Sequence, residues 1–334
     1  MKQGKVKIKD VAEYADVSIS TVSRVLNKKK HVSDQTIKKV LEAVDELGYR
    51  PNKIARGLRT QKTGSIGLII PDITNEFFSN LAKAIEKYLT RFDYNLLLCN
   101  TDENSEEERR YIKTLIDKSV DGIIFISSGN GENMKLFPEE LPVVAIDRKP
   151  QTNRISFVTS ENKKGGWLAT RHLIENGCSN IIMIKDEKKL SPMIDRLEGY
   201  KQALKEYNIE FEEKNIFEIE VNLKSVKELL MRIHQKHDFD GIFAGTDIFA
   251  IGAVKILIKL GYKIPEEIQI IGFDNIPTTG YYNPSITTIS QSLEKMGEKS
   301  ADMIVNMIEN NIDYISEDKS QIMPVKLIKR DTTR

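Results

Sequence analysis

Residues 8–27 read IKDVAEYADVSISTVSRVLN, and this stretch decides how the start of the chain folds. Val11 and Ala15 lie one helical turn apart, as do Val22 and Val25, so each pair marks the apolar face of a short helix. The residues between the two faces leave room only for a tight turn. The pattern predicts a helix-turn-helix, in which the second helix is suited to the major groove of DNA.

A third helix is predicted at residues 37–47, where apolar residues recur at the same spacing. Ser33 is placed to cap it by accepting a hydrogen bond from a free backbone N–H, and Gly48 stands where a left-handed residue is wanted. Pro51 stops continuation. Residues 52–62 are then polar and too short to hold a helix alone in water, so their folding should depend on a partner.

From residue 63 onward, short β-branched runs alternate with amphipathic helical stretches, one of them at residues 105–118 with a Ser105/Glu108 capping box. Continuous apolar strands separated by helices are typical of parallel sheets covered on both faces. About nine strands exceed one comfortable sheet. The sequence therefore predicts a two-lobed α/β body of two doubly wound parallel sheets, with the chain crossing between them more than once. The runs are SIGLII, NLLLC, DGIIFI, LPVVAI, IIMI, IFEIEV, DGIFA, IQIIGF and IMPVKLI.

The predicted organisation is thus an all-α helix-turn-helix domain at 1–50, a hinge or linker at 51–62, and a two-lobed body at 63–334. Charge follows this division, because residues 1–62 hold 15 Lys/Arg and 7 Asp/Glu, a net +8, whereas the other residues hold 35 and 42, a net −7. We expect the basic part and the acidic part to meet different partners.

Composition excludes several classes of protein. Hydrophobic residues make up 40% and charged residues 30% of the 334, which suits a globular protein with buried cores and argues against disorder. We find no apolar run long enough for a membrane span and no secretory signal. Cys99 and Cys178 lie far apart without CxxC spacing. The expected location is the reducing cytoplasm.

The second helix of the helix-turn-helix carries hydroxyl groups and one arginine on its outer side. Ile19, Ser20 and Arg24 are predicted to meet base edges, and Arg24 is able to donate two parallel hydrogen bonds to a guanine, worth ~1–3 kcal/mol of discrimination. A solvated helical hairpin that binds nothing would show the same periodicity. The other candidate DNA contacts in this region are Ser18 and, for phosphates, Thr21, Ser23, Asn27 and His31.

Residues 31–78, HVSDQTIKKVLEAVDELGYRPNKIARGLRTQKTGSIGLIIPDITNEFF, continue the first motif with a YxPN boundary and an ARxL segment at matching spacing. With these motifs the chain resembles the lactose-repressor (LacI/GalR) family of bacterial transcription regulators, and the likeness extends to PVKLIKRDTT at residues 324–333. The resemblance implies a sequence-specific DNA-binding regulator that reads a palindromic operator as a homodimer.

The resemblance also implies that residues 52–59 form a hinge helix only on DNA, where two such helices lie side by side in the minor groove. Asn52 and Ala55 match hinge positions, and Leu58 matches the leucine that wedges between the central base pairs. Gly57 departs from the commoner pattern. Because Gly costs about 1 kcal/mol in a helix interior, this hinge should be weak without its partner.

Polar side chains follow several predicted strands at the ends where open α/β sheets bind ligands. Carboxylates, guanidinium groups and amides beside aromatic rings suit a polyol, whose hydroxyls each donate and accept. Singly, each residue has a structural explanation such as a helix cap or a surface ion pair. Jointly they predict one cleft between the lobes. The candidate ligand contacts are Asp72, Asn75, Phe77, Phe78, Asp147, Arg148, Arg196, Thr246, Asp274 and Gln291.

The order NxFF, IDR, DRxxGY, GFD and SQ is similar to that of ribose-binding members of the same superfamily. This likeness implies that the polar candidates hydrogen-bond a sugar while the two phenylalanines pack against its apolar face. Thr246 departs from the likeness, since ribose binders have an Asn there. Ribose is the expected effector, and another furanose-forming or hexose sugar, including fructose or a sucrose-derived product, is the alternative.

We expect sugar binding to rotate the lobes, separate the hinges and release the operator of a sugar-utilisation operon, so that the chain is an inducible repressor. A coupling of ~1–3 kcal/mol would suffice. A solute-binding protein without DNA function shares such a body but would lack residues 1–62. Since we find no nucleophile motif or phosphate loop, we expect neither catalysis nor a cofactor. His234 and His237 share metal-like spacing but read as a solvated helix end.

Overall fold

The structure is a computed structural model that describes residues 6–26, 32–49, 62–129, 131–310 and 320–334. The chain divides into two compact units, Met1–Thr63 and Gly64–Arg334. Within the described ranges, no helix is both long and apolar enough to span a membrane. The predicted DNA contacts Asn27, His31, Asn52, Ala55 and Leu58 lie outside those ranges.

The described residues of the N-terminal unit form three helices, as predicted: α1 Ile8–Tyr14, α2 Ile19–Leu26 and α3 Asp34–Glu46. Valines and alanines from all three helices form a small buried core. Asp16 allows the tight turn before α2 through a left-handed conformation, with φ 53°. The Ser33 side chain accepts from the Thr36 N–H and caps α3, and Gly48 has φ 60°, both as expected.

Two six-stranded sheets form the body and confirm the predicted α/β architecture. The first sheet has the order β11-β5-β4-β3-β1-β2 and the second has β12-β10-β9-β8-β6-β7. The central strands are buried along their whole length because helices cover both faces. We call the parts built on these sheets the first lobe and the second lobe. The first sheet comprises β1 Ser65–Ile70, β2 Asn95–Asn100, β3 Gly122–Phe125, β4 Val143–Ile146, β5 Ser156–Ser160 and β11 Gln321–Met323; the second comprises β6 Ile181–Asp186, β7 Ile216–Ile219, β8 Gly241–Ala244, β9 Gln269–Asp274, β10 Thr287–Ser290 and β12 Lys326–Ile328.

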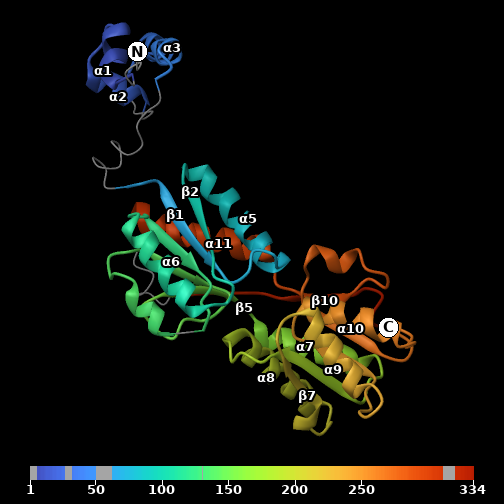
Figure 1. The fold of residues 1–334 in the computed structure, drawn as a ribbon. Helices are drawn as coiled ribbons and strands as arrows, with labels where there is room; N and C mark the ends of the chain where they lie inside the picture. Colours follow the sequence, from blue (N-terminus) through green and yellow to red (C-terminus); the bar gives the residue numbers. More distant parts are fainter. Residues whose placement is uncertain (1–5, 27–31, 50–61, 130, 311–319) are drawn as a thin grey trace. The chain divides into compact units, whose positions relative to one another are not determined.

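Helices α5, α6 and α11 pack in the first lobe, and α7, α8, α9 and α10 pack in the second (Figure 1). The helix α11 comes late in the chain, yet it lies against α5 and under β3 and β4. Short 3-10 helices occupy several loops. The helices are α5 Glu76–Leu89, α6 Ser105–Asp117, α7 Asn162–Glu175, α8 Ser191–Glu206, α9 Leu223–Ile233, α10 Asp247–Lys259 and α11 Leu293–Asn310, and the 3-10 turns are η1 Thr90–Phe92, η2 Gly131–Leu136, η3 Glu213–Asn215 and η4 Pro277–Gly280.

The chain crosses between the lobes more than once, as predicted: after β5, after β10 and after β11. The last crossing corrects one expectation, because the run IMPVKLI is two short strands rather than one. Pro324 lacks the N–H that a continuous strand would need, so β11 ends before it and β12 begins in the other sheet. Strand β12 also runs antiparallel to β10, the exception in otherwise parallel pairing.

The predicted Ser105/Glu108 capping box is wrong. Asn104 caps α6 instead, since its side chain accepts from the N–H groups of Glu106 and Glu107. The Glu108 carboxylate is buried and accepts from the Ser128 N–H at 2.5 Å. The Glu108 side chain therefore organises the loop after β3 rather than the start of its own helix.

Candidate functional site

The outer face of α2 carries the predicted DNA-reading residues. Val22 and Val25 are buried and fix the orientation of the helix, so that Ile19, Ser20 and Arg24 are exposed. The exposed fraction of Ile19 is 47%, so its side chain is accessible beside Ser20 and Arg24.

Ser18 stabilises the start of this helix through its side chain. Its Oγ accepts from the Thr21 N–H at 3.1 Å and lies 2.7 Å from the Ser20 hydroxyl, so it closes the turn before α2. Thr21 and Ser23 are half-buried beside it. The contacts of Ser18, Thr21 and Ser23 with DNA stay a prediction.

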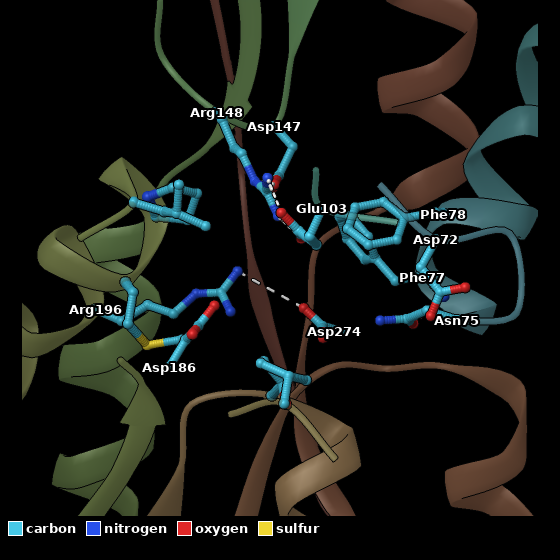
Figure 2. A pocket seen from close by; sticks show the side chains of 15 residues that line it. Asp72, Asn75, Phe77, Phe78, Glu103, Asp147, Arg148, Asp186, Arg196 and Asp274 are labelled. Carbon is cyan, nitrogen blue, oxygen red and sulfur yellow. Dashed lines mark hydrogen bonds and ion pairs between the residues drawn. The ribbon is translucent and has the colours of Figure 1, made fainter. Parts of the chain in front are cut away.

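A pocket of about 140 Å³ lies in the body where strands of both lobes end (Figure 2). Nine of the ten predicted ligand contacts line its wall, all except Gln291. Sequence reasoning missed six further wall residues. These are Glu103, Asp186, Leu190, Pro192, Met193 and Val221.

Arg196 projects from α8 on the second-lobe side of the pocket and is held on several sides. Its Nε donates to Asn162 Oδ1 at 2.9 Å, and its Nη1 donates to the Gly245 carbonyl at 2.6 Å. The guanidinium lies over the Phe273 ring, 3.6 Å from the centroid. Its Nη2 is 3.7 Å from Asp274 Oδ1, which leaves a fork of N–H groups directed at the pocket.

Asp274 ends β9 and meets Arg196 across the pocket floor. Burial raises the pKa of Asp274 to about 7, and Arg196 opposes that rise. Gln291 is fully buried behind Asp274 and donates from Nε2 to its Oδ1 at 2.6 Å. The structure therefore places Gln291 in support of Asp274, away from the pocket wall.

Asp147 follows β4 in the first lobe and has φ 67°, a left-handed conformation that is uncommon for a residue with a side chain. Burial raises its pKa, although Arg148 and Arg196 oppose the rise. Its buried Oδ1 has no hydrogen-bond partner among the described residues. An unpartnered buried acceptor costs free energy, so it suits a ligand that brings a hydroxyl donor.

Arg148 does not offer its whole fork to the pocket. Its Nη1 and Nη2 donate to the two carboxylate oxygens of Glu103 at 3.0 and 2.6 Å, and Nη1 also donates to the Ser127 carbonyl. Lys188 of the second lobe lies 3.3 Å from the same carboxylate. Burial opposes ionisation of Glu103, but the charges of Arg148 and Lys188 hold its pKa below the usual value.

Glu103 and Asp186 follow or end strands β2 and β6, which is the signal that identified the other pocket carboxylates. The same rule applied to every strand would have found both. Leu190 and Val221 in loops, and Pro192 in the first turn of α8, carry no such signal, because apolar residues are common at such positions.

Aromatic and capping residues form the first-lobe side of the pocket. Phe77 and Phe78 begin α5 and contact each other edge to face, with centroids 5.1 Å apart. The Asn75 Oδ1 caps this helix by accepting from the Phe77 N–H, while Figure 2 shows its amide nitrogen pointing to the middle of the pocket. Asp72 accepts from the Thr74 N–H through Oδ1 at 2.8 Å.

Thr246 caps α10 by accepting from the Phe249 N–H at 3.4 Å, and it lines the pocket as well. Its neighbour Asp247 is fully buried outside the wall, where Thr288 and the Ile276 N–H donate to its two oxygens. Thr246 therefore faces the pocket, and Asp247 ties β10 to α10.

The pocket wall holds five carboxyl groups and two guanidinium groups, so its net charge stays negative even when Asp274 is protonated. Such a wall suits a neutral molecule rich in hydroxyls and disfavours an anion. Among the described residues, no three His, Cys, Asp or Glu side chains form a group able to hold a metal ion. His234 and His237 instead contact the Leu230 carbonyl and Asn215 Oδ1.

Comparisons with known proteins cover both parts of the chain. The family described as periplasmic binding proteins and sugar binding domain of LacI family matches residues 63–331, and that of bacterial regulatory proteins, lacI family, matches residues 7–52. The chain is 39% identical to the ribose operon repressor of Halalkalibacterium halodurans over 98% of this chain and 97% of that protein.

Two solved structures extend the comparison. The lac repressor dimer bound to operator and an anti-inducer aligns with a TM-score of 0.85 at 25% identity, covering 98% of this chain and 99% of that one. A LacI family regulator from Enterococcus faecium with bound ribose aligns at 0.72 and 29% identity, covering 80% and 98%. With a helix-turn-helix followed by a two-lobed sugar-binding body, the chain belongs to the LacI family of bacterial regulatory proteins, which are DNA-binding transcription regulators and not enzymes.

Proposed function

We propose that this regulator represses a ribose-utilisation operon in the cytoplasm and that ribose, bound between the lobes, releases it from its operator. The observation that carries the proposal is the meeting of Asp147 from the first lobe with Arg196 and Asp274 from the second at one buried pocket. A molecule that hydrogen-bonds all three binds both lobes at once. It thereby favours one lobe arrangement over another, which is the requirement for a switch.

The size of the pocket favours a monosaccharide. A cavity of roughly 150 Å³ holds a single small ring, and this one measures about 140 Å³. A disaccharide would need the lobes to separate. Ribose is favoured among single rings by the similar H. halodurans repressor and by the E. faecium regulator with bound ribose.

Two wall residues keep other sugars as alternatives. Thr246 offers one hydroxyl where ribose binders of the superfamily carry an amide, and Val221 is a small apolar side chain at the second-lobe edge. A threonine side chain is shorter than that of asparagine, so the wall at residue 246 is set further back. Fructose in its furanose form, or another hexose, is therefore the second candidate.

Repression requires that α2 read DNA, and a homodimer supplies the second α2 that a palindromic operator needs. Arg24 is the residue we assign to base reading, and Ile19 and Ser20 are its neighbours at the groove. The hinge residues 52–59, with Asn52, Ala55 and Leu58, are proposed to order only on operator DNA.

The test combines a sugar screen with an operator gel shift. Ribose at about 100 times its dissociation constant should stabilise the protein by about 2.7 kcal/mol and release a palindromic fragment from the promoter of a neighbouring sugar operon. Ribose 5-phosphate should do neither, because the wall is acidic. If fructose stabilises the protein and ribose does not, fructose is the effector in place of ribose. Sugar binding without any DNA shift would make the chain a solute-binding protein, and tighter DNA binding with ribose would reverse the sign of the switch.

A further inference from the structure

Asn162 lies behind the pocket at the first crossing between the lobes and does not line the pocket wall. It is the first residue of α7 and is buried, with 1% exposed. Its amide makes three contacts. The oxygen accepts from Arg196 Nε at 2.9 Å, and the nitrogen donates to Thr159 Oγ1 at 3.4 Å and to the Ser160 carbonyl at 3.1 Å.

Thr159 continues this chain of hydrogen bonds into the first lobe. Its Oγ1 accepts from Asn162 and donates to the Asp147 carbonyl at 2.6 Å, so the hydroxyl uses both of its functions. Asp147 has a left-handed backbone conformation that its surroundings must hold in place. The bond from Thr159 is made to that strained residue.

The packing of α7 on α8 makes the Arg196 end of the chain rigid. A Cβ on Gly166 would come within 2.1 Å of the Arg196 carbonyl oxygen, and one on Gly199 within 1.9 Å of the Lys163 carbonyl oxygen. The two helices therefore touch backbone to backbone at Arg196. If Arg196 moves, the start of α7, where Asn162 lies, must move with it.

We infer that Asn162 and Thr159 are positioning residues that couple the two halves of the ligand pocket through the Asp147–Thr159–Asn162–Arg196 chain. The inference rests on the proposed function only in taking the pocket as the effector site. A helix cap is the plain alternative role for a polar residue at this position. The Asn162 side chain makes no such cap, because its three bonds go to Arg196, Thr159 and the preceding strand.

Thr170 provides a matched control. It is also buried on α7, and its Oγ1 donates to the Gly166 carbonyl at 2.9 Å, but this bond stays within the helix. Thr159→Val and Thr170→Val thus each remove one buried hydroxyl and one bond to a carbonyl. D-ribose titrated into the full-length protein by calorimetry should bind about fivefold more weakly to T159V, at least tenfold more weakly to Asn162→Leu, and within twofold of wild type to T170V. Equal affinities for T159V and T170V would overturn the inference.

Trp167 adds a spectroscopic readout, since it is the sole tryptophan of the chain and lies on α7 after Asn162. Its Nε1 donates to Glu206 on α8 at 2.6 Å. Ribose should change its emission in the wild type and in T170V. In N162L saturated with ribose, the change should be lost. A full change in saturated N162L would show that occupancy reaches α7 without Asn162 and would contradict the coupling.

A sugar-free experiment separates this inference from the identity of the effector. Arg196→Lys keeps the positive charge but removes the Nε–H that reaches Asn162. The urea midpoint shifts of R196K and T159V should be non-additive in the wild-type background and additive in N162L, because Asn162 is the link between them. Additive shifts in both backgrounds would overturn the coupling. Absence of heat with ribose in wild type would instead refute ribose as the effector.

Discussion

Asp147 and Asp274 both stand at strand ends with positive φ, 67° and 122°. Each faces the pocket from a different lobe. Such backbone conformations cost about 1–3 kcal/mol of free energy and persist where surrounding interactions hold them in place. Here Thr159 holds the Asp147 carbonyl and Gln291 holds the Asp274 carboxylate. The strain aims two carboxyl groups at the same small volume.

Asp274 should make stability fall as pH rises. Its pKa is raised to about 7 by burial, so between pH 4 and 7 the folded protein keeps a proton that the unfolded chain has lost. The free energy of unfolding, measured with urea, should decrease across this range by about 1.4 kcal/mol or more, the equivalent of one pKa unit. Asp147 and Asp247 act in the same direction. Asp274→Asn should flatten the dependence, and an unchanged slope in D274N would contradict this assignment.

Glu103 is expected to lower the affinity of the pocket for phosphorylated ligands. It occupies the Arg148 fork and adds a negative charge to the pocket wall. Glu103→Gln should strengthen binding of ribose 5-phosphate roughly fivefold, as removal of about 1 kcal/mol of repulsion implies. Glu139→Gln, in an exposed ion pair with Arg154, is the control and should change nothing. Calorimetry with both variants measures the effect; equal phosphate affinities would exclude this role.

At the scale of elements, pattern predicted most strands and helices, but the nine apolar runs left out β5 and β10. Strand β5 reads SFVTS; its buried Thr159 hydroxyl donates to the Asp147 carbonyl, whereas the buried Ser160 Oγ has no hydrogen-bond partner among the described residues. A strand inside a sheet is hard to predict when its side chains are polar and their hydrogen-bond partners are distant in the sequence. The run IMPVKLI was predicted as one strand because it is largely apolar, but the chain breaks at Pro324 into β11 and β12.

In the candidate site, too, local sequence position predicted some residues, whereas others depend on partners that are distant in the sequence. Residues at strand ends were predictable, because parallel strands bring their carboxyl ends to one edge. Gln291 also follows a strand end and was predicted to contact the ligand, yet it lies behind Asp274. Asn162 carried no signal at all, since its partners are separated from it by the path of the fold.

The helix α2 should lose sequence discrimination when Arg24 is replaced. Arg24 is exposed on the outer face of a helix whose inner face is buried, so Arg24→Ala should leave the fold intact. Binding to the operator should weaken by ~1–3 kcal/mol, while binding to random DNA changes much less. Lys38→Ala, on an exposed face of α3, serves as the charge-matched control. A gel shift with both DNAs decides, and equal losses on the two DNAs would show that Arg24 contacts only phosphate.

At the scale of the whole body, polar contacts link the lobes around the pocket. Lys149 of the first lobe lies 2.6 Å from Asp195 of the second, and Lys188 lies 3.3 Å from Glu103. Near the start of α5, Glu76 accepts from the Thr278 N–H at 3.1 Å. These contacts join the two lobes beside the pocket, so moving the lobes apart would break them.

Lys149→Met should therefore weaken ribose binding, but only two- to threefold, because a half-exposed ion pair is worth less than about 1 kcal/mol. The same pair should make the wild-type affinity fall with salt. Titrations at low and high NaCl should show a steeper salt dependence for wild type than for K149M. Lys135→Met, whose partner Glu132 lies in the same lobe, should match wild type. Identical salt dependence in wild type and K149M would mean that the pair does not favour closure.

The late return of the chain to the first lobe has a consequence for how the protein is made. Helix α11 and strand β11 complete that lobe, yet they are translated only after the whole second-lobe core, and β12 then adds the last strand to its neighbour. While the ribosome is still short of residue 293, the earlier half exposes apolar surface that α11 later covers. Nascent chains stalled before that point should bind chaperones, and a premature stop there should yield a protein that aggregates rather than a smaller sensor.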